Sequence, residues 1–594
     1  MRRVALAVLA LALLAPAAQA ARTPTRPVYD ARGRLVQTPF APLAARPRLT
    51  RDHATAIFVR NDKVADWLGR YPERGRVTDA TFDKARRDWK VGVWWGSAGE
   101  IATGRVDDAT GVVTEAWTGP QVAWKMARGY EGAFGGKEMN STALWLALSF
   151  VFLLGLADLR RPLSLRNLDL VVLLSFSISL WFFNRGDVFT SVPLAYPPLL
   201  YLLGRMAWIA WRGGPRPSRP VWPLWLLAAT TVFLAGFRLG LNVQNSNVID
   251  VGYSGVIGAH RIANGQSPYG HMPIEGNLKP CGPKAADGEI RERIQTNGRC
   301  ESADERGDTY GPVAYEAYLP GFAALGWSGR WDKLPAAHAT AIAFDLLVLL
   351  GLALLGRRFG GARLAVTLSF AWAAYPFTQY VSNSNTNDAI MPAFLVFGFW
   401  LAATSFGRGA FLALAAWTKF AAILLAPLWL GYPEALRRPS GKALFAGGFA
   451  AATLGSFSIL LLEPDPAHAA RVFWDRTLGW QVGRDSPFSI WGWGQYHAAG
   501  IPDLGWLQQV VIGLLAFGAI ACFFVPRRKT PLQLAALTAA LLIGFEIALT
   551  HWFFLYIPWF FPFVAFVVLA SRPRREPQAA RAHDPETREL VAAG

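Results

Sequence analysis

Long apolar stretches alternate with short polar ones through most of this chain of 594 residues. Each of the main apolar stretches is about 17 to 22 residues long, which is the length that crosses a bilayer as an α-helix. They cover residues 141–157, 166–184, 192–211, 221–241, 336–356, 364–381, 388–405, 443–462, 504–525, 531–549 and 552–570. The pattern predicts a polytopic α-helical membrane protein with about 11 spans.

One further apolar stretch, "AFLALAAWTKFAAILLAPLWLG" at 410–431, needs separate treatment. If it were a full span, all later clusters of basic residues would fall on the wrong side of the membrane. We therefore expect a re-entrant pair of short helices, broken around Trp417 to Lys419 and buried in the protein or facing a cavity. A twelfth full span is the alternative.

The basic residues between the apolar stretches predict the orientation of the chain. If residue 141 starts outside the cytoplasm, every basic cluster falls on the cytoplasmic side, as the positive-inside rule requires. The clusters are Arg160 and Arg161; Arg212, Arg216 and Arg219; Arg357, Arg358 and Arg363; Arg437, Arg438 and Lys442; Arg527, Arg528 and Lys529; and Arg572, Arg574 and Arg575. The outer face then receives the long loops 242–335 and 463–503, the turn "NSNTND" (383–388) and His551.

The first twenty residues have the features of a secretory signal peptide. Arg2 and Arg3 precede a short apolar core, and small residues at 18–20 form a cleavage site. An uncleaved anchor is the alternative, and in both cases residue 21 onward lies outside the cytoplasm. We therefore expect a multi-pass protein of the cell (plasma or inner) membrane, with a disordered cytoplasmic tail at 572–594.

Composition excludes two other classes of protein. A chain of this length with 53% hydrophobic residues and 25 tryptophans is too apolar for a soluble multidomain protein. The net charge of +18 could suggest nucleic acid, but much of the arginine lies in short runs that orient membrane helices. We therefore expect no nucleic-acid partner.

Residues 21–140 are polar and predict a small α+β domain outside the cytoplasm. A helix is expected over 50–72, started by Thr50 or Asp52, and the stretches "WKVGVWW", "EIATGRVDD" and "VVTEAWTG" predict an antiparallel meander. The stretch "VDDATGVVTEAW" (106–117) resembles the repeat of PepSY-type domains. That resemblance implies a binding or regulatory module for a partner in the cell envelope; a small domain without a partner is the alternative.

Unusual polar residues collect in the first outer loop, at "VIDVGYSGVIGAHRIANGQSPYG" (248–270). They are Asp250, Tyr253, His260, Arg261 and Tyr269. The simplest explanation for Asp250 alone is the N-cap of a loop helix. The same loop also contains "GDTYGPVAYEAYLPG" (307–321), with Asp308 and Tyr310.

Other stretches on the outer side add tryptophans and further charged groups. The stretch "WDRTLGWQVGRDSPFSIWGWG" (474–494) contains Arg484, and "LTHWFFLYIPWFFPF" (549–563) contains His551. Aromatic rings with scattered polar groups suit a sugar, although an interfacial aromatic belt explains some of the tryptophans.

The order of these motifs resembles the GT-C superfamily of membrane glycosyltransferases. An early aspartate in a large outer loop, then "GQSPYG" and "DTYGPVAY", is most similar to the polyprenyl-phosphate-mannose-dependent branch, as is the lysine of "AAWTKFAAILLAPLWL" (415–430). The likeness covers residues 221–571, the expected catalytic module. Residues 141–220 depart from the family pattern and read as additional transmembrane helices.

The resemblance implies transfer of a mannose-like sugar from a polyprenyl-phosphate donor to a glycan or glycolipid acceptor outside the cytoplasm. Asp250 corresponds to the general base, with Asp308 as the alternative. The candidates for holding the donor phosphate are His551, Arg484 and Lys419, in that order, and the other polar residues of the first loop are candidate substrate contacts. The donor is a substrate, so no cofactor and no metal are expected.

Each phosphate candidate has a simpler explanation. Lys419 could extend toward the cytoplasmic edge of the membrane, Arg484 could pair with Asp485 or Asp475, and His551 could cap a helix or belong to the aromatic belt. Asp388 opens a span after a polar turn, which favours a helix N-cap.

Cysteine usage adds one expectation about the first outer loop. Cys281 and Cys300 lie in one polar insert of the loop, where the compartment permits a disulfide, whereas Cys522 lies in an apolar run.

Two other functions remain open on the sequence. Polar residues within membrane segments and a re-entrant segment also mark transporters and lipid flippases. A regulatory membrane protein is the third reading.

Overall fold

A computed structural model describes residues 28–37, 46–84, 86–128, 132–212, 222–283, 290, 292–296, 298–330, 334–434 and 438–570. The expected signal peptide at 1–20 and the expected tail at 572–594 lie outside these residues. The chain divides into two compact units, Met1–Ala127 with Trp493–Asp503, and Arg128–Gly492 with Leu504–Gly594. The first unit includes Trp493–Asp503, a piece of the loop 463–503, and the expected domain boundary at residue 140 stays a prediction.

The first unit is built on a four-stranded antiparallel sheet in the order β3-β4-β5-β6. Its strands are β3 (Arg76–Asp83), β4 (Asp88–Trp95), β5 (Glu100–Asp107) and β6 (Val113–Thr118). The meander expected from the Val- and Trp-rich stretches is therefore present, with β3 as a strand that the sequence did not predict. The unit also contains β1 (Val28–Tyr29), β2 (Leu35–Gln37) and the start of α4 (Pro120–Arg128).

Two helices precede the sheet where the sequence predicted one. Thr50 caps α2 (Arg51–Val59) by accepting the His53 N–H, and α3 (Asp62–Leu68) starts after a break at Arg60 and Asn61. The helix α2 packs closely on the sheet because residue 104 is glycine: a Cβ there would lie 2.4 Å from the Phe58 ring. Phe58 is fully buried, and the resulting core holds the unit together.

The segment Trp493–Asp503 belongs to this unit through contacts with α3 and the residues that follow it. Arg70 and Ala499 exchange two hydrogen bonds, from the Ala499 N–H to the Arg70 carbonyl at 3.2 Å and from Arg70 Nη1 to the Ala499 carbonyl at 3.1 Å. Tyr496 packs edge-to-face on Trp67 at 6.2 Å.

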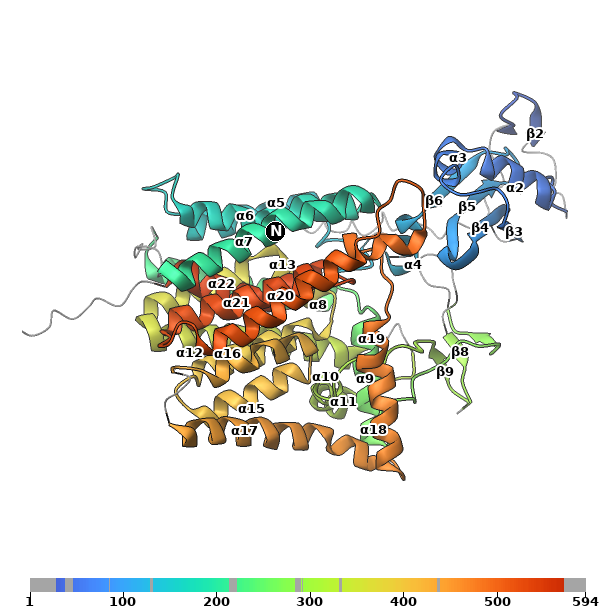
Figure 1. Ribbon diagram of the computed structural model, residues 1–594. Coiled ribbons are helices and arrows are strands. Elements are labelled where there is room, and N and C mark those ends of the chain that lie inside the picture. The colour runs from blue at the N-terminus through green and yellow to red at the C-terminus, as the bar shows by residue number, and fades with distance from the viewer. Residues whose placement is uncertain are drawn as a thin grey trace, which may run out of the picture. The chain divides into compact units, whose positions relative to one another are not determined.

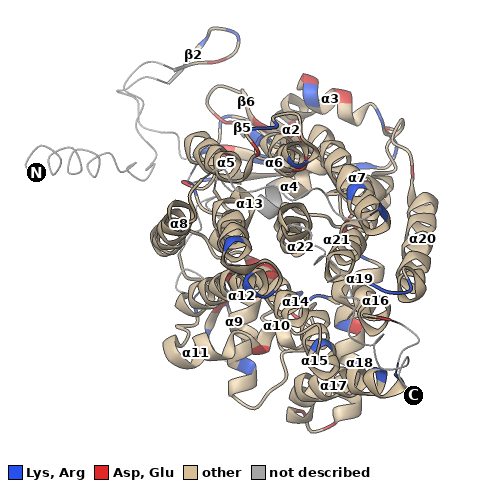
Figure 2. Ribbon diagram, turned by 90° about the vertical axis from the view of Figure 1, so that its left-hand side faces the viewer, with Lys and Arg blue, Asp and Glu red and all other residues tan. Residues whose placement is uncertain are grey.

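The second unit is helical, and its long helices lie side by side in Figure 1. Long and short together, the helices of this unit are α5 (Thr142–Leu156), α6 (Leu165–Phe183), α7 (Val188–Arg212), α8 (Leu224–Gln244), α9 (Asp250–Ala263), α10 (Val313–Glu316), α11 (Leu319–Leu325), α12 (Pro335–Ala374), α13 (Pro376–Asn383), α14 (Ile390–Trp400), α15 (Ser405–Ala416), α16 (Ala426–Leu430), α17 (Pro439–Phe457), α18 (Pro466–Trp474), α19 (Trp480–Val482), α20 (Gly505–Phe524), α21 (Pro531–Ala548) and α22 (Ile557–Leu569). In Figure 2 these ribbons are mostly tan, since charged residues occupy only a few positions in each helix that has any.

Within the described residues, 6 helices are long and apolar enough to cross a membrane. Three shorter apolar helices, Thr142–Leu156, Phe420–Leu430 and Phe554–Leu569, accompany them. The chain is therefore a multi-pass helical membrane protein, while the number of 11 spans stays a prediction.

The longest helix, α12, is a hairpin of two arms. Gly361 has a φ of 71°, outside the helical region, and interrupts the 40 residues of α12. The arms fold back on each other, since Ser369 Oγ donates to the Leu349 carbonyl at 3.3 Å. Their close approach requires glycine at 356, where a Cβ would lie 2.4 Å from the Ala365 nitrogen. The two separate segments expected from the sequence, 336–356 and 364–381, correspond to the two arms and the start of α13.

The apolar stretch at 410–431, expected to be re-entrant, breaks where the sequence predicted. The helix α15 ends at Ala416, Lys419 is extended, and a 3₁₀ helix (Phe420–Leu425) leads into α16. Buried Arg408 near the start of α15 donates to the carbonyls of Trp429 at 2.9 Å and Tyr432 at 3.1 Å. Both ends of the segment therefore lie at one level, which places Lys419 at the apex of a helical hairpin.

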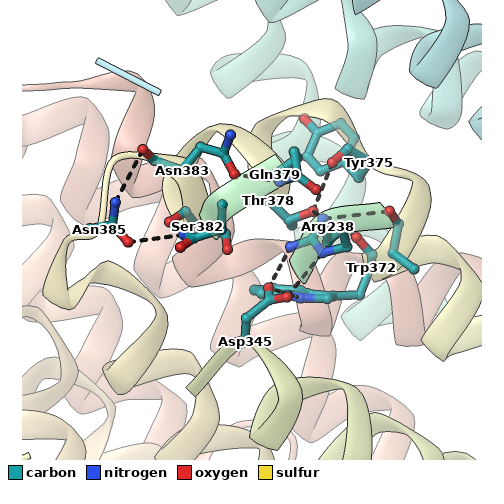
Figure 3. Close-up of polar contacts among 11 residues, drawn as sticks. Arg238, Asp345, Trp372, Tyr375, Thr378, Gln379, Ser382, Asn383 and Asn385 are labelled. Atoms are coloured by element: carbon teal, nitrogen blue, oxygen red, sulfur yellow. Dashed lines mark hydrogen bonds and ion pairs between the residues drawn. The ribbon is translucent and has the colours of Figure 1, made fainter. Parts of the chain in front are cut away.

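An ion pair inside the helical bundle joins α8 to α12 (Figure 3). Arg238 Nε donates to Asp345 Oδ2 at 2.9 Å, and both side chains are buried. Trp372 Nε1 donates to Asp345 Oδ1 at 2.8 Å, and Arg238 Nη1 donates to Thr378 Oγ1 at 3.2 Å. Two buried charges are stable here because each is paired and its remaining polar atoms have partners.

We expect Arg238→Met to lower the free energy of unfolding by about 3–5 kcal/mol, because Asp345 is then buried without a counter-charge. The double variant Arg238→Met/Asp345→Leu leaves no unpaired charge and should lose less. Denaturant unfolding in detergent micelles measures both. If both variants lose the same free energy of unfolding, the unpaired charge of Asp345 is not the cause of the loss.

Candidate functional site

Six polar side chains from distant parts of the sequence gather in the second unit. They are Asp250, Tyr310, Asp388, Lys419, Arg484 and His551. They come from the start of α9, the turn before α14, the apex of the re-entrant hairpin and the loops that precede α10, α20 and α22. Four of them were expected from the sequence as the base and the phosphate-binding groups.

Asp250 begins α9, and Ile249 occupies the N-cap position. The carboxylate is therefore in the first helical turn and not in the capping role that a lone aspartate would favour. Its side chain is exposed, yet burial raises the pKa of Asp250, and the Val251 N–H and the charges of Arg484 and Lys419 lower that pKa in part. Exposure together with strong desolvation is expected of a carboxylate that faces a recess in the protein.

Lys419 is buried and pairs with Asp388. Its Nζ lies 3.1 Å from Asp388 Oδ1, and Trp559 Nε1 donates to the same oxygen at 3.2 Å. The ammonium also lies over the rings of Tyr310, at 4.4 Å, and of Trp559, at 5.6 Å. One carboxylate and several aromatic faces together stabilise the charge of this buried cation.

The position of Asp388 differs from the expected helix N-cap. Thr386 takes that role, since its Oγ1 accepts the Asp388 N–H at 3.2 Å. The Asp388 carboxylate is thereby available to Lys419. The sequence feature that could have indicated this role of Asp388 is the single lysine in the apolar stretch 410–431, because a buried lysine needs an acid as partner.

Arg484 and His551 form a second polar group. Arg484 Nη2 lies 3.4 Å from His551 Nε2, and Ser486 Oγ lies 2.8 Å from His551 Nδ1. Burial, together with the charges of Arg484 and Lys419, lowers the pKa of His551 well below its usual value. The histidine is thus neutral, accepts from Arg484 and donates through Nδ1 to Ser486, so the positive charge here is that of Arg484.

Tyr310 is held by two other tyrosines of the first outer loop. Tyr269 Oη donates to the Tyr310 carbonyl at 2.9 Å, and the Tyr310 N–H donates to Tyr315 Oη at 3.2 Å. Tyr269 and Tyr315 are buried. Tyr269, an expected substrate contact, therefore supports the backbone of a residue that contacts Lys419.

Three further candidates from α9 make contacts within the loop. Tyr253 Oη donates to the Ser302 carbonyl at 3.0 Å, and Arg261 Nε donates to the His271 carbonyl at 3.0 Å. His260 Nε2 lies 3.0 Å from Arg299 Nη1, and burial followed by the charge of Arg299 lowers the pKa of His260 to about 4. Arg261 Nη2 also lies 3.5 Å from Glu301 Oε2, so all three side chains join α9 to the loop insert.

That insert carries a disulfide between Cys281 and Cys300, with an S–S distance of 2.08 Å. The bond links β7 (Pro280–Cys281) to β9 (Cys300–Ser302), which pair with β8 (Glu292–Ile294) in a small antiparallel sheet. The bridge closes a short loop beside α9 and restricts its conformations.

Asp308, the alternative base, is fully buried. Its Oδ2 accepts from Arg476 Nε at 2.7 Å and from the Gly270 N–H at 2.7 Å. The carboxylate ties the loop before α10 to the segment after α18. An acid held in an ion pair away from solvent is poorly placed to receive a proton from an acceptor.

Asp304 is an acid near Asp250 that the sequence analysis missed. Ser254 Oγ lies 2.5 Å from Asp304 Oδ2 and also donates to the Asp250 carbonyl at 2.7 Å. Burial, then the charge of Asp250, raises the pKa of Asp304 to about 7. Among several acids in "CESADERGD" (300–308), nothing local distinguishes this one.

The arrangement combines one accessible carboxylate with two cations in a largely desolvated setting. Such a site can receive a proton at Asp250 while Arg484 and Lys419 stabilise a nearby anion. Among the described residues no group of three or more His, Cys, Asp or Glu side chains could hold a metal ion.

A solved membrane-protein structure shows a partial likeness to this chain. No protein-family model matches the chain, and no curated protein matches it. The chain is similar to ArnT from Cupriavidus metallidurans, whose crystal structure is bound to undecaprenyl phosphate, with 15% identity and a TM-score of 0.37. The match covers 58% of this chain and 59% of ArnT, so less than two thirds of that protein is spanned. The likeness is loose, and the function is inferred from the chain's own residues.

We expect Asp304→Asn to flatten the dependence of stability on pH. Because the pKa of this acid rises on folding from 3.8 to about 7, its folded environment favours the protonated form, and stability falls as pH rises between these values. Asparagine keeps a donor toward Ser254 without ionising. Unfolding midpoints measured from pH 4 to pH 8 should fall less in the variant than in the wild type; parallel curves would contradict the assignment.

Proposed function

We propose that the protein is an integral membrane glycosyltransferase. It moves a mannose-like sugar from a polyprenyl-phosphate donor to a glycan or glycolipid acceptor on the extracytoplasmic side. The observation that carries the proposal is the accessible carboxylate of Asp250 beside the cations Arg484 and Lys419. This set of groups supplies both needs of the reaction, a base and a site for an anionic leaving group.

In the proposed reaction the acceptor hydroxyl oxygen bonds to C1 of the donor sugar. The bond between C1 and the phosphate oxygen breaks, and its electron pair stays on the polyprenyl phosphate. Asp250 takes the hydroxyl proton, a contribution of typically ~10²–10⁴-fold for a positioned general base. Atoms and charge then balance with no metal or cofactor.

Arg484 is the main candidate for the leaving phosphate. Lys419 already has Asp388 at 3.1 Å, so its charge is partly compensated, whereas the partner of Arg484 at 3.4 Å is a neutral imidazole. A guanidinium also matches phosphate oxygens with two parallel hydrogen bonds. His551 then orients Arg484, and Lys419 adds positive potential from the other side.

The first unit has a separate proposed role. Its helices followed by an antiparallel meander agree with the PepSY-like resemblance of the sequence. We propose that it binds a cell-envelope partner outside the cytoplasm, and that the helical unit crosses the membrane with about 11 spans.

Sugar transfer by the purified full chain in nanodiscs tests the proposal. Undecaprenyl-phosphate mannose and arabinose serve as donors, and release of undecaprenyl phosphate is followed with membrane glycolipid extract as acceptor. We expect Asp250→Asn to lower kcat by about 10²–10⁴ with donor binding retained. Asp308→Asn is the comparison and should stay within about tenfold of the wild type, because its role is structural.

If Asp308→Asn loses sugar transfer and Asp250→Asn keeps it, Asp308 is the general base and Asp250 is not. If the wild type turns over no donor but moves a lipid-linked sugar across proteoliposome membranes, the flippase reading replaces the transferase.

The pH dependence of kcat gives an independent check. A general base must be ionised, and burial raises the pKa of Asp250 above 3.8. Activity should therefore fall on the acid side with a midpoint above that of an ordinary aspartate, and the residual rate of Asp250→Asn should lack this limb. A wild-type rate that stays flat down to pH 4 would contradict a base with a raised pKa.

A further inference from the structure

A cluster of buried amides joins the two chain segments that lead to Asp250 and Asp388. Asn242 is in the last turn of α8, and Asn385 is in the turn after α13; both are fully buried. Asn242 Nδ2 donates to Asn385 Oδ1 at 2.9 Å and to the Ser382 carbonyl at 2.6 Å. Figure 3 shows Asn385 and Ser382 in this cluster, next to the Arg238 ion pair.

Asn385 also reaches the segment that precedes Asp250. Its Nδ2 lies 2.9 Å from Ser246 Oγ and donates to the Asn247 carbonyl at 2.9 Å. Backbone bonds continue the contact, from the Asn247 N–H to the Asn383 carbonyl at 3.0 Å and from the Ile249 N–H to the Ser384 carbonyl at 3.4 Å. Residues 246–249 are therefore fastened along the turn at 383–385.

The two segments approach as closely as their backbones allow. A Cβ on Gly252, in the first turns of α9, would lie 2.1 Å from the Asn385 carbonyl oxygen. Asn385 itself has a φ of 51°, in the left-handed region that asparagine tolerates better than most residues. This close contact requires glycine at 252, and at 385 it requires a residue that tolerates the left-handed region.

The spacing of the two acids follows from these bonds. Asp250 comes directly after Ile249, and Asp388 comes three residues after Asn385. The chain between each bonded residue and its acid is too short to let the acid keep its place if the bonded residue moves. A displacement at Asn385 would therefore move Asp250 relative to the Asp388–Lys419 pair.

We propose that Asn385 is a positioning residue that, through Asn242, Ser246 and Asn247, sets the distance between Asp250 and the Asp388–Lys419 pair. This inference rests on the proposed transferase function. It assigns the asparagine-rich turn a role in the reaction, although none of its amides contacts the reacting atoms.

The test compares Asn385→Gly with the wild type in the nanodisc transfer assay, with undecaprenyl-phosphate mannose as donor. Glycine accepts the left-handed backbone and removes only the side-chain bonds. We expect kcat to fall by about 10- to 100-fold, because a misplacement of about 1 Å at a reacting group costs that much. The KM for the donor should change by less than about threefold, since Arg484 is not touched.

A pH profile separates positioning from loss of structure. Asp250 is faced by Arg484, Lys419, Asp388 and Asp304, and the two cations lower its pKa. If Asp250 drifts from these cations, the acid limb of kcat should move to higher pH by about half a unit or more.

Gln379→Ala is the matched control, because it removes another buried amide of the same cluster, one that bonds Asn383 at 2.6 Å and not the segment before Asp250. It should lower stability and leave the acid limb in place. Ser246→Ala, which removes one bond of Asn385, provides a milder second variant and should shift the limb in the same direction.

Three results would overturn the inference. If Asn385→Gly and Ser246→Ala are folded and keep the wild-type kcat and acid limb, the amide cluster has a structural role only and the transferase proposal stands. If Gln379→Ala shifts the acid limb of kcat as much as Asn385→Gly does, the shift comes from a general loss of stability and not from the bonds of Asn385. If the wild type turns over no donor, the proposed function fails and the inference fails with it.

Discussion

An ammonium group buried among apolar helices must have a counter-charge, and Asp388 provides it for Lys419. Lys419 Nζ lies 3.1 Å from Asp388 Oδ1, and both side chains are buried. The pair fixes the apex of the re-entrant hairpin against the turn before α14, and aromatic rings from the first outer loop and α22 close around it. Without this pairing, a broken helix with a lysine at its tip would not be stable inside the bundle.

The same constraint explains the other polar groups of the bundle. Arg238 and Asp345 satisfy each other, with Trp372 and Thr378 as further partners. The amides of Asn242 and Asn385 satisfy each other and the backbone of two irregular segments. In a low-dielectric interior each such group needs a partner, so the polar network determines where the helix ends and loops lie, and these ends form the candidate site.

The sequence predicted the elements near the site well, and their partners less well. It placed the break of the re-entrant segment at Trp417–Lys419, the separate arms of α12 and the antiparallel meander of the first unit. It selected Asp250, Lys419, Arg484 and His551, which the structure brings together, while their roles toward the donor stay predictions. Tyr253, His260 and Arg261 were selected by the same criteria, and in the structure they bond α9 to the disulfide insert.

The sequence by itself determined that the chain is a helical membrane protein with a separate polar N-terminal domain, because hydrophobic length and periodicity act locally along the chain. The basic clusters predict an orientation in the membrane, and with it which polar loops face the outer side, and that orientation stays a prediction. Only the tertiary structure decided which acids are paired, which histidine is neutral and which carboxylate is accessible. Those properties depend on neighbours that are far away in sequence, such as Arg476 at 168 positions from Asp308 and Trp559 at 171 positions from Asp388. Burial changes the state of a charge only once these neighbours surround it.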